Sequence, residues 1–327
     1  MKNCARMYEI SSDKLKIVLH HPGDGFYRGT RFDRSGVFGS MLYTASDTDH
    51  APVELCGRWF SRYDPFMHDA VCGPAEEFSL MVLPGTAPSH PGTAPVWLKP
   101  GVGLLVPDGA PYDRFKLYEI ADEGVWRVES TPDSVTFIHE LPGYYVYEKQ
   151  IVRGGKDCFE IRHKLHTFVP LEGDVYNHNF FTFGKMASGP SREIELHCTP
   201  DGDWRAQYSQ VGFVGEGLRF TRILEDGESV YCGNIHEKGT NALPYCFTLR
   251  ETSVPTPPTT PTSPSAPAAS VAPAIAVHIT GDRPASKAVF WANHRIACLE
   301  PYTPLHALPG TTLTWTLRYT IALSRNG

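Results

Sequence analysis

Alternation between apolar and polar residues recurs along most of this sequence, and it restricts the chain to short strands. In residues 311–323 one face of an extended chain carries only large apolar side chains, namely Leu313, Trp315, Leu317, Tyr319 and Ile321. The same alternation marks residues 115–120, 125–130, 134–141, 144–152 and 158–168. Turn signals such as Pro-Asp, Pro-Gly and Gly-Gly separate these segments, so the pattern predicts antiparallel strands connected as a meander.

Glycine and proline reinforce this prediction, because both residues interrupt helices. The chain of 327 residues contains 29 glycines and 28 prolines, so we expect an all-β protein, a large antiparallel β-sandwich with few short helices. Residues 253–273 hold seven prolines and no charged or aromatic residue. This segment is predicted to be a disordered loop insertion between strands at 244–251 and 274–281. The three strands predicted after it have no core of their own, which favours a single domain over residues 1–327.

Charge and composition exclude several classes of function. Lys and Arg number 30 against 36 Asp and Glu, a net charge of −6, which provides no excess to bind nucleic acid or an anionic membrane. No apolar run reaches the roughly 18 residues of a membrane span, and the first 21 residues lack the apolar core of a signal peptide. We therefore expect a cytoplasmic protein, a monomer or homodimer, with reduced cysteines.

Metal and nucleotide sites have no support in the sequence. The eight cysteines are scattered without a C-x-x-C pair, and His163 and His166 fall on opposite faces of a predicted strand. The phosphate-binding loop, the dinucleotide glycine motif and the G-x-S-x-G elbow are absent. We therefore expect no metal and no cofactor.

The segment Asp174 to Gly184 places polar residues inside an aromatic run that otherwise indicates a buried strand. On a strand, His178 shares a face with Tyr176 and Phe180, while Asn177 and Asn179 point the other way. Buried polar side chains need partners or a ligand. A core histidine bonded to a backbone carbonyl is the alternative interpretation.

A second candidate is the segment 295–302, in which Ile296, Cys298 and Glu300 share one face of a strand predicted to end at Pro301. A carboxylate on an apolar face is costly unless it is paired, and its surroundings can tune it as a base. An exposed glutamate at a strand end is the alternative.

Two further segments carry clustered charges. Residues 27–36 group three arginines and one aspartate around two glycines, namely Arg28, Arg31, Arg34 and Asp33. Guanidinium groups and carboxylates bind vicinal hydroxyls and anions, the groups of a sugar or sugar phosphate, although a solvated turn is the alternative. In residues 72–78, the adjacent Glu76 and Glu77 point to opposite faces of an extended chain, so at most one of them faces a given pocket.

Together, Y-N-H-N-F-F (176–181), C-L-E-P (298–301) and R-G-T-R-F-D (28–33) resemble the motifs of the galactose mutarotase-like superfamily, which includes aldose 1-epimerases and hexose-6-phosphate mutarotases. The resemblance spans nearly the whole chain apart from the proline-rich segment. It implies a large β-sandwich whose concave face binds a sugar.

The resemblance also implies roles for individual residues. The family's N-H-x-x-F histidine, the general acid at the ring oxygen, corresponds to His178, and its glutamate base corresponds to Glu300. The family's upstream arginine matches Arg28 or Arg31 only loosely. A further family histidine has no match, and the segment around Glu76 and Glu77 stands in its place, which suggests a divergent branch in which one of them contacts the sugar.

The sequence therefore predicts a carbohydrate epimerase of the mutarotase type, with His178 and Glu300 several ångströms apart across a cavity that holds a pyranose. The further residues predicted to bind the sugar are Arg28, Arg31, Asp33, Glu76, Glu77, Asn177, Trp291 and Tyr302. The clustered arginines allow a phosphorylated substrate. The alternatives are a non-catalytic carbohydrate-binding protein and another sugar-processing enzyme, such as a lyase or glycosidase, on the same fold.

Overall fold

All regular elements of the described residues are β-strands, which confirms the predicted fold class. The computed structural model describes residues 6–44, 52–57, 71–80, 96–183, 187–251 and 274–323, and these residues form 23 strands in four antiparallel sheets. Within these ranges we find no helix with the length and apolar character needed to cross a membrane.

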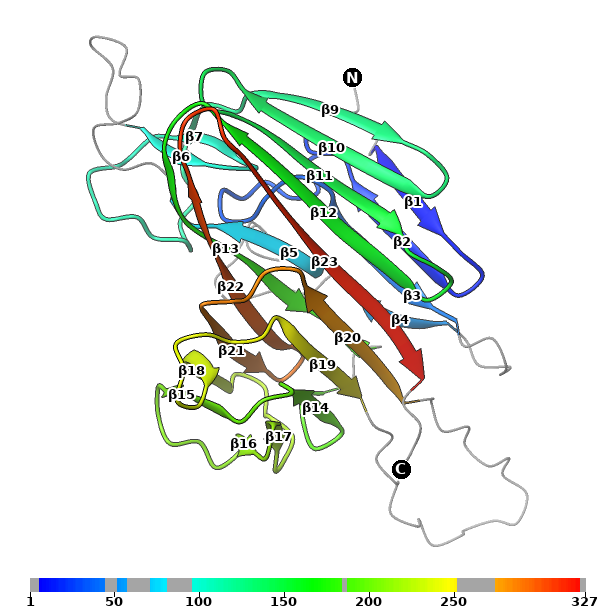
Figure 1. Cartoon of the computed structure of the whole chain (residues 1–327). Coiled ribbons are helices and arrows are strands. Elements are labelled where there is room, and N and C mark those ends of the chain that lie inside the picture. The colour runs from blue at the N-terminus through cyan, green and yellow to red at the C-terminus, as the bar shows by residue number, and fades with distance from the viewer. Residues whose placement is uncertain are drawn as a thin grey trace, which may run out of the picture.

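The largest sheet contains the long strands that Figure 1 shows side by side, β10, β11, β12 and β23. In order across the sheet, its ten strands are β16 (Val211–Val214), β17 (Gly217–Phe220), β14 (Arg192–Glu195), β19 (Cys246–Glu251), β20 (Ile275–Gly281), β23 (Thr312–Leu323), β12 (Cys158–Thr167), β11 (Tyr145–Arg153), β10 (Ser134–Leu141) and β9 (Val125–Ser130). In β23, Trp315, Leu317 and Tyr319 are buried and the intervening residues are more exposed, as their alternation predicts.

The second large sheet has six strands. In order, they are β15 (Pro200–Trp204), β18 (Ser229–Glu237), β21 (Lys287–Asn293), β22 (Ala297–Ala307), β13 (Leu171–Phe180) and β5 (Gly73–Phe78). The predicted end of a strand at Pro301 is wrong, because β22 continues to Ala307. The backbone ladder between β13 and β22 stops at Tyr302, and beyond it the Asn179 side chain donates to the Leu299 carbonyl. Pro301 has no N–H group, but it lies beyond the last residue pair between β22 and β13, so no backbone hydrogen bond between these two strands is lost.

Two smaller sheets complete the described structure. One contains β1 (Met7–Ser11), β2 (Leu15–His20), β3 (Val37–Tyr43) and β4 (Val53–Cys56). The other contains β6 (Trp97–Lys99), β7 (Gly103–Leu105) and β8 (Ile120–Asp122). Ile17 of β2 and Phe38 of β3 join the core of the two large sheets, so the four-stranded sheet extends that core.

The main core lies between the two large sheets. Leu249 and Tyr319 of the ten-stranded sheet pack in one fully buried cluster with Phe290 and Leu299 of the six-stranded sheet. Because side chains alternate along a strand, residues next to Leu299, such as Glu300, point away from this core. The six-stranded sheet therefore has an inner face that packs against the ten-stranded sheet and an outer face that is free to form a site.

Strands on both sides of the proline-rich segment belong to the same sheets. The segment 253–273, predicted to be a disordered insertion, lies outside the described residues. The strands that flank it, β19 and β20, pair directly, with Glu251 opposite Ile275. The four strands that follow the segment, β20 to β23, lie in the interior of both large sheets rather than in a separate layer.

Candidate active site

Three adjacent strands of the six-stranded sheet, β5, β13 and β22, bring the candidate residues together. Tyr176 of β13 lies opposite Glu77 of β5 on one side and Tyr302 of β22 on the other, so these three side chains share a face. His178 lies two residues after Tyr176 on β13, and Glu300 lies two residues before Tyr302 on β22. Because side chains alternate along a strand, both point to the same face as these tyrosines. The sheet therefore assembles residues that are distant in the sequence.

The two predicted catalytic side chains are in contact. His178 Nδ1 lies 2.7 Å from Glu300 Oε1, not several ångströms away across a cavity as the sequence analysis predicted. They occupy neighbouring strands, which are spaced only about 4.8 Å apart, and this explains the contact. Nδ1 is buried and has no aligned hydrogen bond, so the two groups are close without the geometry of a full hydrogen bond.

Glu77 holds the other side of the histidine ring. His178 Nε2 lies 3.0 Å from Glu77 Oε2, and the same oxygen accepts a hydrogen bond of 2.7 Å from Arg31 Nε. Burial alone would raise the pKa of Glu77, but the charge of Arg31 and the bond to His178 hold that pKa well below its usual range. Lys99 adds a second cation, with Nζ 3.8 Å from Glu77 Oε1. Glu77 is therefore an ionised carboxylate beneath the site.

A cavity of about 740 Å³ opens over this face, within the size range of small-molecule sites. Its aromatic lining residues are Phe115, Phe180, Tyr231, Trp291 and Tyr302. The basic ones are Arg31, Arg114, Arg205 and Lys287, and the acidic ones are Asp203 and Glu300. His178 and Glu300 form part of the wall, although His178 itself is fully buried.

The aromatic residues of the cavity form a firm surface. Tyr302 stacks on Tyr176 with ring centroids 4.0 Å apart, and Lys287 Nζ lies 5.1 Å from the centre of the Tyr302 ring. On the other side, Arg205 lies over Tyr231 at 4.2 Å. Flat rings beside cations can contact the apolar face of a sugar and its polar substituents at the same time.

The whole described architecture is similar to solved structures. A provisional aldose 1-epimerase from Escherichia coli K12 has a TM-score of 0.52 at 14% identity, with 98% of this chain and 100% of that chain covered. The Slr1438 protein of Synechocystis sp. PCC 6803 has a TM-score of 0.51 at 10% identity, with 99% and 98% covered. A GalM/aldose epimerase homologue from C. elegans reaches 0.49 at 13% identity, with 98% and 100% covered. No protein-family model and no curated protein matches the sequence.

The chain has the galactose mutarotase-like fold. The fold implied by the sequence motifs is thereby confirmed, at sequence identities too low to transfer an activity.

Within the galactose mutarotase-like fold of this chain, three of the predicted sugar-binding residues line the cavity. Arg31, Trp291 and Tyr302 all contribute to its wall, and Glu77 lies directly behind His178. Arg28 does not line it. Its side chain is exposed and its Nε donates to the carbonyl of Gly25 at 3.3 Å.

Three other predicted sugar contacts lie on the opposite side of the sheet. Glu76 accepts a hydrogen bond from Asn177 Nδ2 at 2.8 Å and forms an ion pair with Lys149, which also lies 3.4 Å from Asp33. His163 Nε2 approaches the same glutamate at 3.1 Å. The expectation that Asp33, Glu76 and Asn177 contact a sugar therefore fails, because strand alternation directs Glu76 and Asn177 inward and Asp33 joins their buried cluster.

Several residues of the cavity wall carry no clear signal in the sequence. Arg114 and Phe115 lie in a loop, since most of the strand predicted at 115–120 does not form and β8 begins only at Ile120. Gly233 and Asn234 enter the cavity wall at a bulge in β18, where Asn234 has a positive φ of 51°. A Gly-Asn pair inside an alternating strand was an available signal for such a bulge.

One group in the site has the residue types of a metal centre. The ligand atoms of His178, Cys298 and Glu300 lie within 4.8 Å of one another, and all three residues are buried. Burial and the charge of Glu300 raise the pKa of the Cys298 thiol well above its usual range. Complete burial beside a carboxylate therefore disfavours the thiolate that would bind a metal here, and the group fits a proton-transfer site better than a metal site.

Proposed function

We propose that this protein is a carbohydrate epimerase of the mutarotase type, which interconverts the anomers of an aldose or aldose phosphate. The observation that carries the proposal is the His178–Glu300 pair, 2.7 Å apart in the wall of a cavity of about 740 Å³. The fold shared with a provisional aldose 1-epimerase supports the same function.

The reaction needs one base and one acid. Glu300 accepts the proton of the anomeric hydroxyl while His178, protonated on both ring nitrogens, delivers its Nδ1 proton to the ring oxygen and keeps its Nε2 proton, so the C1–O5 bond breaks and the open-chain aldehyde forms. Rotation about the C1–C2 bond presents the other face of the carbonyl. Reclosure returns both protons to their original groups. General acid and base catalysis each contribute about 10²- to 10⁴-fold.

The direct contact between His178 and Glu300, called the closed pair here, adds one requirement to this mechanism. His178 Nδ1 is fully covered and lies against Glu300. We infer that the Glu300 carboxylate turns toward the anomeric hydroxyl when a sugar enters, and that this rotation opens Nδ1 to the ring oxygen. Glu77 keeps the ring in place meanwhile, because its carboxylate accepts a hydrogen bond from the Nε2–H group.

The charge of the cavity favours a phosphorylated sugar. Four basic residues line it against two acidic ones. Within the described residues, Arg205 and Lys287 take part in no ion pair, whereas Arg31 is already bound to Glu77. Cations in the cavity wall that have no carboxylate partner are suited to a phosphate group. Of the three arginines that suggested a phosphate in the sequence, only Arg31 reaches the cavity.

Exchange NMR on a panel of aldoses and aldose phosphates tests the proposal directly. The protein should accelerate anomer exchange of at least one sugar, and His178→Ala and Glu300→Gln should each lower that acceleration by about 100-fold or more. Arg28→Ala, at an exposed position outside the cavity, is the matched control and should exchange as fast as the unmodified protein. If both site variants accelerate anomer exchange as much as the unmodified protein does, the roles assigned to His178 and Glu300 are wrong.

A carbohydrate-binding protein without turnover is the second candidate, and the closed His178–Glu300 contact favours it. If the pair stays closed when sugar binds, neither group is available for proton transfer. Saturable binding of a sugar by calorimetry, with no acceleration of exchange for that sugar, would decide for this candidate.

A further inference from the structure

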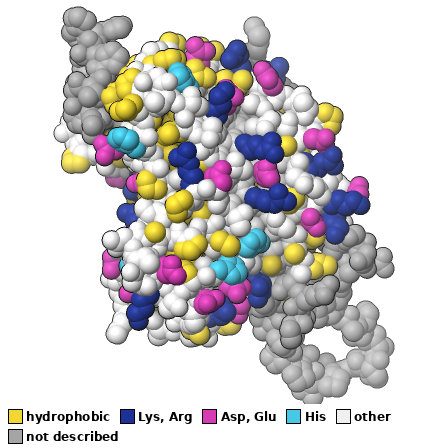
Figure 2. All heavy atoms as spheres, in the orientation of Figure 1, with side chains coloured by type: hydrophobic (Ala, Val, Ile, Leu, Met, Phe, Trp, Pro, Cys, Tyr) yellow, Lys and Arg dark blue, Asp and Glu magenta, His cyan; other side chains and the backbone are white. Residues whose placement is uncertain are grey.

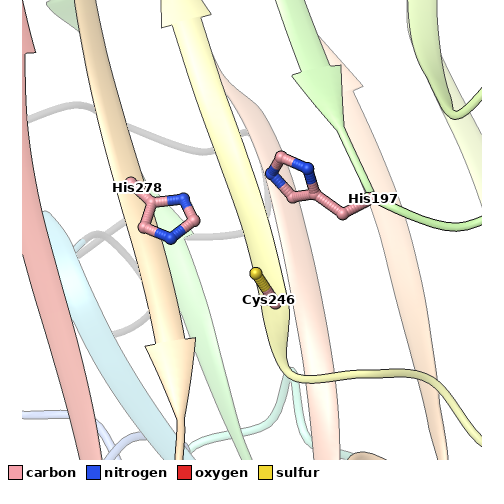
Figure 3. A group of neighbouring side chains, drawn as sticks. All are labelled: His197, Cys246 and His278. Atoms are coloured by element: carbon pink, nitrogen blue, oxygen red, sulfur yellow. The ribbon is translucent and has the colours of Figure 1, made fainter.

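A second group of ligand-type side chains lies far from the cavity, on the outer face of the ten-stranded sheet. His278 is on β20, Cys246 is on the adjacent β19, and His197 follows the end of β14, the next strand across. Figure 2 shows histidine side chains gathered over this part of the sheet. Figure 3 shows the two rings facing each other across the strand that carries Cys246.

The strand register explains why these three residues meet. Thr248 of β19 lies opposite Glu195 of β14 and opposite His278 of β20. Cys246 is two residues before Thr248, so it shares the outer face. His197 is two residues after Glu195 and has a positive φ of 56°, which turns the chain where β14 has ended. Three neighbouring segments thus direct one ligand each to one spot.

Thr248 holds the two rings in this arrangement. Its hydroxyl oxygen lies 3.1 Å from His197 Nε2 and 3.0 Å from His278 Nδ1. A hydroxyl can donate to one ring nitrogen and accept from the other, so both bonds form at once. The ring centroids are 5.7 Å apart with planes at 79°. The Thr248 hydroxyl therefore holds the two rings close together on one face of the sheet, each through one ring nitrogen.

We propose that His197, Cys246 and His278 form a binding site for a zinc ion on the outer face of the sheet. Two imidazoles and one thiolate are ligands that zinc prefers, and three protein ligands leave a fourth position for water or a small anion. The ligand atoms lie within 4.8 Å of one another. Zinc bond lengths of about 2.0 to 2.3 Å place tetrahedral ligand atoms about 3.3 to 3.8 Å apart, so the side chains must close by about 1 Å.

The burial of the three residues permits this closure. His197 is exposed and Cys246 and His278 are half-buried, so their side chains can rotate without disturbing the core. Thr248 lies beneath them, only 6% exposed, where its hydroxyl can keep supporting a ligating ring. Glu195 on the same face is held by Arg250, with Nη2 3.2 Å from Oε2, and is not needed as a ligand.

Metal titration of the chelator-treated full chain tests the site. Co²⁺ replaces zinc and reports a bound thiolate through a sulfur-to-cobalt charge-transfer absorption. We expect one equivalent of Co²⁺ to produce this absorption and Zn²⁺ to displace it. Cys246→Ser should abolish the absorption. His197→Ala and His278→Ala should each weaken Co²⁺ binding by more than the about 10- to 100-fold that the loss of a merely supporting contact costs.

Two control variants keep the test specific. His166→Ala removes a half-buried histidine from the same sheet, one bonded to Thr312 at 2.9 Å, and should bind Co²⁺ as the unmodified protein does. Cys298→Ser removes the buried thiol beside Glu300 and should leave the absorption intact. The proposal is wrong if the chain binds no Co²⁺, if the absorption persists in Cys246→Ser, or if it disappears in Cys298→Ser. Equal loss in His166→Ala and His278→Ala also overturns it.

Discussion

Glu77 determines which nitrogen of His178 can act on a substrate. Glu77 Oε2 lies 3.0 Å from His178 Nε2, and the low pKa of Glu77, caused mainly by Arg31 against the effect of burial, keeps the carboxylate ionised. An ionised carboxylate can only accept a hydrogen bond, so Nε2 must carry a proton. Nδ1 is then the atom that exchanges a proton, and it is the atom next to Glu300.

Glu77→Gln should therefore slow catalysis without preventing binding. An amide can donate as well as accept, so it no longer imposes a proton on Nε2. We expect kcat for anomer exchange to fall by about 100-fold, within the range of general acid catalysis, with KM nearly unchanged. Nitrogen-15 NMR of the neutral ring, recorded above the pH at which Nδ1 loses its proton, should show one tautomer in the unmodified protein and a mixture of tautomers in the variant. Glu172→Gln, an exposed substitution on β13, is the control. An unchanged tautomer together with an unchanged kcat would contradict the role given to Glu77.

The contact between His178 and Glu300 predicts that their substitutions do not add. Each residue is useless for ring opening without the other, because one removes a proton while the other supplies one. The double variant His178→Ala/Glu300→Gln should therefore be about as slow as the slower single variant, not slower by the product of both effects. Rates from exchange NMR at saturating sugar give the comparison. Full additivity would mean that the two groups act in separate steps.

Lys287 should distinguish phosphorylated from neutral sugars. Lys287→Met keeps the aliphatic packing on Tyr302 but removes the charge. A charged hydrogen bond contributes about 1.5 to 3 kcal/mol, so KM for an aldose phosphate should rise about tenfold to a hundredfold, while KM for the neutral aldose stays constant. The effect should shrink at high salt. Lys238→Met, an exposed substitution next to β18, is the control. Equal effects on both substrates would exclude a phosphate at this position.

Local pattern was sufficient to predict much of the fold. The alternation in residues 311–323 predicted β23 and its buried face, and the adjacent Glu76 and Glu77 were predicted to face opposite ways, as they do. Both predictions depend only on the two-residue repeat of a strand.

Lateral strand order could not be predicted in this way. The 2.7 Å contact of His178 with Glu300 follows from β13 and β22 being neighbours, a relation between distant segments that alternation does not encode. For the same reason Arg114 was missed, because its loop reaches the cavity only in the folded chain. Asp33 and Asn177 were predicted to bind the sugar because the sequence around them shows no partner. Their partners, Lys149 for Asp33 and Glu76 for Asn177, come from other strands.

His139 should make the protein less stable in mild acid. The side chain is fully buried, with Nε2 2.8 Å from the Glu123 carbonyl and Nδ1 3.0 Å from the Tyr145 hydroxyl. Burial, assisted by Arg34, lowers the pKa of His139 from 6.5 to about 4. Between these values the unfolded chain binds a proton that the folded chain does not, so the free energy of unfolding falls as pH decreases, by up to about 3 kcal/mol.

His139→Gln tests this contribution, because glutamine keeps a donor and an acceptor but does not titrate. The free energy of unfolding, measured by urea denaturation between pH 7 and 4, should depend less on pH in the variant. At pH 7 the variant should have the lower free energy of unfolding, and the difference between the two proteins should become smaller toward pH 4. Parallel curves for the two proteins would show that His139 contributes nothing to the acid sensitivity.

Lys149 should be essential for stability rather than for catalysis. It is buried between the two sheets, paired with Glu76 and 3.4 Å from Asp33. Burial would raise the pKa of Glu76, but Lys149 and His163 lower it to about 2. This carboxylate therefore stabilises the fold above its unfolded pKa of 4.5 and loses that contribution as pH falls toward 2.

Lys149→Met leaves two buried carboxylates without their cation, and the free energy of unfolding at pH 7 should fall by about 3 to 5 kcal/mol. Lys164→Met, on the exposed face of β12, should change it by less than about 1 kcal/mol. Equal effects of the two substitutions in urea denaturation would show that the buried cluster does not stabilise this fold.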